Sequence, residues 1–277
     1  MTQTSNSNPY ISQDNKPTLR RSVVAFVDIL GYKELSRKES TSVDFLIRLR
    51  DALQNSFRPL DPDVGAHSGY QCFWMTKTFT DNIVIGFPII SEDSSSELIM
   101  ILGRLGQFQL QMSLAGFFVR GAVSVNKLYM DDHIVFGPAL IEAHDGEQKL
   151  ARDPRIVLCD SAREMCENYD LSDLTKNMQH QHDILFKDAD EQLVLNYLYG
   201  IVEFEHDMGY PATDYLQDHR AIIKDRLKSY TSKPKIWTKY LWCAMYHKYF
   251  CLGRDDFVEF KINMGSFLPQ PQRNFSS

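Results

Sequence analysis

Two aspartates, Asp28 and Asp81, stand where carboxylates can hold metal ions. Asp28 comes near the end of an apolar run, 22–30, and Asp81 follows a polar tetrad, 77–80, at the tip of an expected hairpin. Mg²⁺ and Mn²⁺ prefer oxygen ligands, and two such ions about 4 Å apart support displacement at phosphorus. Aspartate is also common at strand boundaries, so either residue alone is equally well explained as the edge of a turn.

The elements around these residues predict how the two carboxylates meet. The run 22–30 is rich in β-branched residues and stops at Gly31, which favours a buried central strand. Apolar residues then recur at helical spacing over 33–57, which predicts a helix. Residues 70–76 and 81–87 read as two strands of a hairpin, so Asp81 is expected at its tip.

The same alternation continues through the middle of the chain. Helical spacing over 97–114 predicts a second long helix, and 117–125 with 127–136 predict another hairpin. A helix from Pro138 and a strand over 156–159 follow. The order β-α-β-β-α-β-β-α-β predicts an α/β (α+β) fold, in which helices pack on a ferredoxin-like palm sheet.

Beyond Asp160 the pattern is weaker and becomes mainly helical. It predicts a helix over 161–169, strands over 184–186 and 193–199, and helices over 216–230 and 236–250. The polar stretch at the start has no apolar residues from which to build a core. We therefore expect a mobile arm over 1–19, a main domain over 20–200, and a helical C-terminal extension over 201–277.

Composition narrows the classes of function. The 277 residues are 43% hydrophobic, enough for a substantial core, and no apolar stretch approaches the ~18 residues that a membrane span needs. The start of the chain also lacks the apolar segment of a signal peptide, so we expect a cytoplasmic protein. A net charge of −6 without a basic run argues against nucleic-acid binding. The five cysteines form no C-x-x-C pair and are expected to be reduced.

Several phrases resemble the class III adenylate and guanylate cyclases. F-V-D-I-L-G-Y, 26–32, resembles their first metal motif F-x-D-I-x-G-F, with Tyr32 in place of the final Phe. K-T-F-T-D, 77–81, resembles their hairpin motif K-x-x-G-D, with Thr80 in place of Gly. The segments 119–125 and 136–137 are similar to the next strand of that family and to the start of its dimer-arm helix. This resemblance covers about 20–160.

The resemblance implies a role for each matching residue. Asp28 and Asp81 would bind two Mn²⁺ or Mg²⁺ ions through their side chains, and the backbone carbonyl of Ile29 would bind one of them. The triphosphate would lie on backbone amides in the turn that enters the first helix. Those amides belong to Leu30, Gly31, Tyr32 and Lys33. A helix N-terminus is physically suited to that task.

The chain departs from the purine cyclases at the arm helix. Their Asn-x-x-x-Arg pair, which positions the ribose and stabilises the transferring phosphoryl group, falls on Ile141 and Asp145 here. Another basic residue must then supply the charge if the enzyme is active. Arg120, within a strand, is the first candidate for the triphosphate, and Arg155 is a second. Two other interpretations are open: the enzyme is retired, or its substrate binds in a different position.

A longer resemblance, over nearly the whole chain, is to the bacterial pyrimidine cyclases of the Pycsar anti-phage systems. It rests on the phrases already quoted, on 137–143 and 154–157, and on the late K-Y-L-W…Y-H segment. It implies a homodimer with active sites at the interface, which converts UTP or CTP to cyclic UMP or cyclic CMP. That product would activate a separate effector. Lys77, where adenine-specific relatives place a base-reading lysine, and Phe79 are candidates for contact with the base.

Two alternatives remain open from the sequence. Lys77 suits an adenylate or guanylate cyclase, although the missing arm residues oppose that interpretation. From another class, the chain could be an inactive cyclase-like module that binds a nucleotide or a partner. The presence of both aspartates argues against an inactive module, because a retired site has no need to bring two carboxylates together.

Overall fold

The structure is a computed structural model that describes residues 8–39, 42–60, 73–90, 94–168, 184–203 and 211–267. The chain divides into two compact units, 1–209 and 210–277, and each is considered by itself. The first unit carries Asp28 and Asp81. The expected boundary lay at residue 200, whereas the described backbone of the first unit continues through helix α7 (Tyr199–Glu203).

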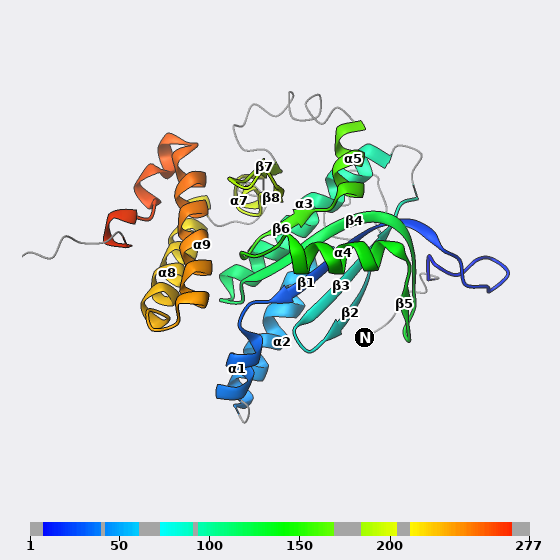
Figure 1. Cartoon of the computed structure of the whole chain (residues 1–277), viewed down its shortest axis with the longest axis horizontal. Coiled ribbons are helices and arrows are strands. Elements are labelled where there is room, and N and C mark those ends of the chain that lie inside the picture. The colour runs from blue at the N-terminus through cyan, green and yellow to red at the C-terminus, as the bar shows by residue number, and fades with distance from the viewer. Residues whose placement is uncertain are drawn as a thin grey trace, which may run out of the picture. The chain divides into compact units, whose positions relative to one another are not determined.

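The first unit is built on a sheet with β1 (Arg20–Ile29) near its centre (Figure 1). β1 pairs antiparallel with β3 (Asn82–Pro88) on one side and with β4 (Val119–Met130) on the other. β2 (Met75–Phe79) pairs antiparallel with β3. The resulting order β2-β3-β1-β4, with helices in both crossovers, is that of a ferredoxin-like β-α-β-β-α-β unit. The predicted fold class is therefore confirmed.

The sheet extends beyond β4 through shorter strands. β6 (Ile156–Leu158) lies parallel to β4, and β8 (Leu193–Leu195) and β7 (Leu185–Lys187) follow in antiparallel pairing. β5 (Val135–Phe136) pairs with the far end of β4. The parallel β4–β6 step needs a crossover, which α4 (Pro138–Lys149) provides.

Helices cover both faces of the sheet, and the period of two along β1 decides which residues face them. Val23, Ala25 and Val27 face a core that contains α2 (Val43–Phe57) and α3 (Ser94–Leu114). Val24 lies on the opposite face, in a second cluster with residues of α4. Figure 1 shows α4 lying over one face of the sheet. Asp28 has the same parity as Val24 and therefore lies on the α4 face.

Some element boundaries differ from the predicted ones. The expected helix over 33–57 is two helices, α1 (Tyr32–Lys38) and α2, because the Ser42 side chain caps α2 by accepting a hydrogen bond from the Phe45 amide. The predicted strand over 70–76 begins only at Met75 among the described residues. It then runs through Lys77 to Phe79, so only Thr80 and Asp81 form the turn.

The predicted hairpin over 117–136 is also different, because its break comes later. β4 continues through Met130 as one 12-residue strand. The chain turns at Asp131, whose Oδ1 accepts hydrogen bonds from the amides of His133 and Ile134. Asn126, where the break was expected, lies inside the strand. An aspartate side chain that bonds its own downstream backbone is an effective turn former.

The start of the chain also departs from the expected mobile arm. Tyr10 is fully buried in the α4-side cluster, and its hydroxyl lies 3.0 Å from Ser22 Oγ on β1. The Asn8 side chain donates a hydrogen bond to the Met130 carbonyl, and Ile11 bridges to Pro17. The described part of this segment is therefore tied to the sheet by the buried Tyr10 ring and by the Asn8 hydrogen bond. Residues 1–7 lie outside the described part.

The second unit is helical in its described part, 211–267. Its elements are α8 (Ala212–Ser229), α9 (Pro234–Leu252), η3 (Asp255–Phe260) and η4 (Met264–Phe267). His219 and His247 join the two long helices in the core, with 2.9 Å between their Nδ1 atoms. Among all described helices of the chain, none combines the length and apolar character required to cross a membrane.

Candidate active site

The sheet register brings Asp28 and Asp81 to the same end of the molecule. Asp28 pairs directly with Asn82 on β3, the residue after Asp81. The amide of Ile29, which follows Asp28, donates a 2.9 Å hydrogen bond to the Asp81 carbonyl. This bond fixes the β2–β3 turn against the end of β1. The two residues that the sequence singles out, 53 positions apart in the chain, are therefore neighbours.

The turn presents the Asp81 carboxylate at a polar surface. Thr80 adopts a positive φ of 51°, a conformation that glycine adopts more easily. The K-x-x-G-D motif that 77–81 resembles has Gly at this position. The Thr80 hydroxyl lies 2.7 Å from Asp81 Oδ1 and 2.6 Å from the Phe79 carbonyl, so its single proton is shared between these two acceptors. The Ile29 amide faces Asp81, and in antiparallel pairing the carbonyl of the same residue faces the same way. The Ile29 carbonyl is thus directed toward the turn.

Asp28 already has a cationic neighbour. Arg120 lies directly opposite it on β4, and Arg120 Nε donates a 3.0 Å hydrogen bond to Asp28 Oδ2. Arg120 Nη2 lies 2.7 Å from Glu147 Oε1, and Nη1 donates to the Ala151 carbonyl at 3.4 Å. Asp28, Arg120 and Glu147 therefore form a chain of two ion pairs on the α4 face of the sheet.

Glu147 is the functional candidate that sequence reasoning missed, because a charged residue on a helix is usually solvated. Its side chain is fully buried in the last turn of α4. Burial raises the pKa of Glu147, the Arg120 charge lowers it, and the Asp28 charge raises it. A signal was present in the sequence: Ala139, Ala143 and Glu147 recur every four residues, which places the glutamate on the small-residue face that packs on the sheet.

The expected phosphate cradle is only partly available. The Leu30 amide donates a 2.8 Å hydrogen bond to the Phe118 carbonyl, so it has no proton to offer a phosphate. We therefore remove Leu30 from the cradle. Gly31 caps α1 with a φ of 73°, and the Tyr32 and Lys33 amides belong to the first turn, whose N–H groups have no partner within the helix. The Lys33 side chain is exposed.

Arg155 does not belong to this site. Its guanidinium is 2% exposed, and Nη1 and Nη2 bind Asp188 and Asp190 in the loop between β7 and β8. Nη2 also donates to the Leu150 carbonyl at 3.2 Å. Burial lowers the pKa of Arg155, but the two aspartates outweigh this and raise it, as expected for a structural ion pair. The assignment of Arg155 to the triphosphate is withdrawn.

The candidate base-reading residues lie on β2, beside the turn that carries Asp81. Lys77 pairs with Val84 on β3 and is partly exposed, and Phe79 is 58% exposed. Trp74, another aromatic residue of this region, stacks on Phe57 at 5.7 Å against the main core. Phe79 is therefore more accessible to a base than Trp74.

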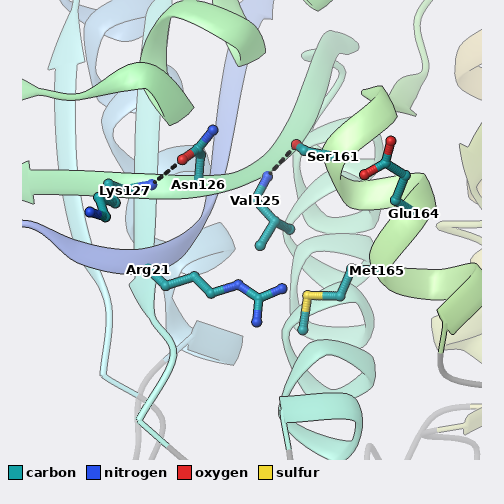
Figure 2. A pocket seen from close by; sticks show the side chains of 7 residues that line it. All are labelled: Arg21, Val125, Asn126, Lys127, Ser161, Glu164 and Met165. Carbon is teal, nitrogen blue, oxygen red and sulfur yellow. Dashed lines mark hydrogen bonds between the residues drawn. The ribbon is translucent and has the colours of Figure 1, made fainter.

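A pocket of about 370 Å³ lies elsewhere in the first unit, between β1, β4 and α5 (Asp160–Asn168) (Figure 2). It is lined by Arg21, Val125, Asn126, Lys127, Ser161, Glu164 and Met165. Arg21 is seven residues from Asp28 along an extended strand, or about 23 Å. This pocket is therefore separate from the carboxylate site.

The predicted metal-binding set consists of two carboxylates and one backbone carbonyl. No group of three or more His, Cys, Asp or Glu suited to a metal occurs among the residues that the structure describes. Hard oxygen donors of this kind suit Mg²⁺ and Mn²⁺, which keep several ligand positions for water and substrate phosphates. The Arg120 guanidinium on Asp28 shows that this carboxylate accepts a cation at the same end of the sheet.

Comparison with known proteins gives only structural similarities. Neither the family models nor the curated proteins searched gave a match. The adenylyl cyclase CyaB from P. aeruginosa is similar over 55% of this chain and 83% of its own, at 14% identity and a TM-score of 0.44. The guanylyl cyclase Cya2 is similar over 64% of this chain and 91% of its own, at 11% identity and a TM-score of 0.40. We base the functional proposal on this chain's own residues and sheet topology.

Proposed function

We propose that this protein is a nucleotidyl cyclase that converts UTP or CTP to the 3′,5′-cyclic monophosphate and pyrophosphate. The observation that carries the proposal is the meeting of Asp28 and Asp81 at one end of a ferredoxin-like sheet, through the hydrogen bond from the Ile29 amide to the Asp81 carbonyl. The motifs around both residues resemble those in which class III cyclases hold their metals. The pyrimidine preference rests on the sequence resemblance and on the altered arm helix.

The metal-holding residues in this proposal are Asp28, Asp81 and the Ile29 carbonyl. Two Mn²⁺ or Mg²⁺ ions, when bound, supply positive charge to the attacking 3′-oxygen and to the leaving pyrophosphate. Asp28 would hold these ions from the end of β1 and Asp81 from the β2–β3 turn, which the Ile29 amide ties to β1. Thr80 contributes its hydroxyl, which lies 2.7 Å from Asp81 Oδ1. Asp28 must exchange its bond to Arg120 for the metal ligand position.

The triphosphate would be held at the entrance to α1 and beside β4. The Gly31, Tyr32 and Lys33 amides are assigned to the β- and γ-phosphates, since first-turn N–H groups favour anions. Arg120 donates a hydrogen bond to Asp28 and is assigned to the charge on the transferring phosphoryl group. Lys77 and Phe79 are assigned to the base.

The assembly in this proposal is a homodimer with its active sites at the interface. The arm formed by β5 and α4 presents three large apolar side chains to solvent: Ile134 is 55%, Phe136 62% and Ile141 67% exposed. Large exposed apolar side chains on neighbouring segments of the chain are suited to a protein interface. The product would act as a signal to a separate effector in defence against phage.

The test is a product assay with each nucleotide. Purified protein is incubated with Mn²⁺ and ATP, GTP, CTP or UTP separately, and the products are resolved by chromatography and mass spectrometry. The expected result is a cyclic pyrimidine nucleotide, lost in Asp81→Asn and retained in Asp145→Asn, which removes a half-exposed carboxylate from α4. Cyclic AMP or cyclic GMP would support the purine alternative that Lys77 suggests. Absence of product with all four nucleotides would support a binding module.

A further inference from the structure

We propose that Glu147 is a positioning residue that keeps Arg120 at the metal-binding end of β1 when a metal ion takes Asp28. This inference rests on the proposed function, because it assigns a role within the same site. It is drawn from the chain of ion pairs that links β1, β4 and α4.

Arg120 is held from two sides by different parts of its guanidinium. Nε donates to Asp28 and Nη2 contacts Glu147, with distances of 3.0 Å and 2.7 Å. A cation shared in this way keeps its second partner when the first is removed. Once Asp28 turns to a metal, the Glu147 contact and the Ala151 carbonyl at 3.4 Å are what remain to orient Arg120.

The burial of Glu147 makes it a fixed anchor. Its side chain has no exposed surface, whereas those of Asp28 and Arg120 are 17% and 22% exposed. A buried carboxylate needs a paired cation, and Arg120 Nη2, 2.7 Å from Glu147 Oε1, supplies it. Gln148 donates a 2.7 Å hydrogen bond to Glu147 Oε2, which further fixes the carboxylate.

The close approach of α4 to the sheet places Glu147 within reach of Arg120. At Gly146 a β-carbon would lie 2.5 Å from Cys159 Sγ and 2.8 Å from Ala122 Cβ, so only a glycine lets the last turn of α4 approach this closely. The adjacent Glu147 is thereby brought onto β4, the strand that carries Arg120. The glutamate is positioned by the same packing that closes the β4–α4–β6 crossover.

Removal of the Arg120 charge and removal of the Glu147 charge are expected to change the Mn²⁺ affinity in opposite directions. In Arg120→Gln, Asp28 loses a competing cation, so Mn²⁺ binds more tightly. In Glu147→Gln, Arg120 keeps Asp28 as its one anionic partner among the described residues, and the site loses one negative charge. Mn²⁺ therefore binds more weakly, by about three- to tenfold. Because Glu147 acts through Arg120, its substitution has a smaller effect when Arg120 is already replaced.

The experiment measures Mn²⁺ binding to the full chain, without nucleotide, by electron paramagnetic resonance of the free ion. The set comprises the unsubstituted protein, Glu147→Gln, Arg120→Gln and the double variant, each checked for folding by circular dichroism. Glu142→Gln is the matched control. It neutralises a carboxylate on the same helix whose partner is Ser161, and it leaves Mn²⁺ affinity unchanged.

The outcomes separate this inference from the proposed function. Weaker binding in Glu147→Gln, tighter binding in Arg120→Gln and a diminished effect in the double variant support the inference. A folded Glu147→Gln protein with unchanged Mn²⁺ affinity overturns it and leaves Glu147 a purely structural residue, while Asp81→Asn still weakens binding and upholds the metal site. If Asp81→Asn does not weaken Mn²⁺ binding, the proposed site fails and the inference fails with it.

Discussion

Substitution of Gly146 by alanine tests how closely α4 packs on the sheet. Alanine at a helical position is favoured over glycine by about 1 kcal/mol. The added methyl group would overlap Cys159 Sγ and Ala122 Cβ, at 2.5 Å and 2.8 Å, and overpacking of this kind costs about 1 to 3 kcal/mol. We therefore expect Gly146→Ala to lower the free energy of unfolding by up to about 2 kcal/mol.

A second glycine in the same unit provides the matched control. Gly106 lies within α3, and a β-carbon there would meet the Tyr197 Cα at 3.7 Å and Leu195 Cγ at 4.0 Å, which are ordinary contacts. Gly106→Ala thus gains the helix preference without the overlap and should raise the free energy of unfolding by about 1 kcal/mol. Substitution of glycine by alanine is thus expected to lower the free energy of unfolding at position 146 and to raise it at position 106.

The assay is urea unfolding followed by tryptophan fluorescence, in a Trp237→Phe, Trp242→Phe background. Trp74 is then the remaining tryptophan, and it reports on the first unit because it stacks on Phe57. Cys159→Ala in the Gly146→Ala protein removes the nearer overlap and should recover part of the loss, with a coupling of about 1 kcal/mol. A Gly146→Ala protein as stable as Gly106→Ala would refute the close approach from which the position of Glu147 was argued.

Two further predictions concern ion pairs and buried histidines. Arg155→Leu should destabilise the first unit by about 2 to 3 kcal/mol, because it removes the cation that pairs with two partly buried carboxylates. Lys149→Ala breaks an exposed pair with Asp145 and should leave the free energy of unfolding nearly unchanged in the same urea assay. Burial lowers the pKa of His219 well below its usual value and that of His247 to about 4, so the unfolded chain binds protons near pH 6.5 that the folded chain refuses. The contribution of these histidines to stability should therefore be complete above pH 6.5 and be lost as the pH falls toward 4. The loss from His247 alone is about 3 kcal/mol. Thermal unfolding of the full chain measures this change, and a midpoint that is the same at pH 7 and pH 5 would contradict the prediction.

The fold was predictable because local patterns agreed with one another. The β-branched run that ends at Gly31 and the helical spacing before Gly116 each fixed the type of an element. Boundaries failed where a single polar side chain decided the geometry. Ser42 begins a new helix by capping it, and Asp131 ends a strand by bonding two downstream amides. Periodicity carries no information about such bonds, because they depend on one side chain and not on a repeat.

The sequence predicted the site residues that belong to local motifs. It did not predict those that depend on contacts between distant segments of the chain. The motifs led to Asp28 and Asp81, which the hairpin register then placed together. Leu30 was lost from the phosphate cradle because its amide is used by a neighbouring loop, a tertiary contact that no motif records. Glu147 was overlooked because charge on a helix is usually solvated, and its burial depends on the glycine beside it.

In the proposed enzyme, the sheet supplies the cation that the arm helix supplies in purine cyclases. The arm positions that correspond to Asn and Arg in purine cyclases carry Ile141, which is 67% exposed, and Asp145, a half-exposed acid. An apolar residue and a negative charge on that surface favour contact with protein over contact with phosphate. A cation that pairs with Asp28 comes from β4 instead, where Arg120 is fixed by an acid on the buried face of the same helix. In the proposed enzyme, α4 thus positions Arg120 on β4 through Glu147, and Arg120 faces the phosphoryl group. The outer face of α4 remains free to form the dimer.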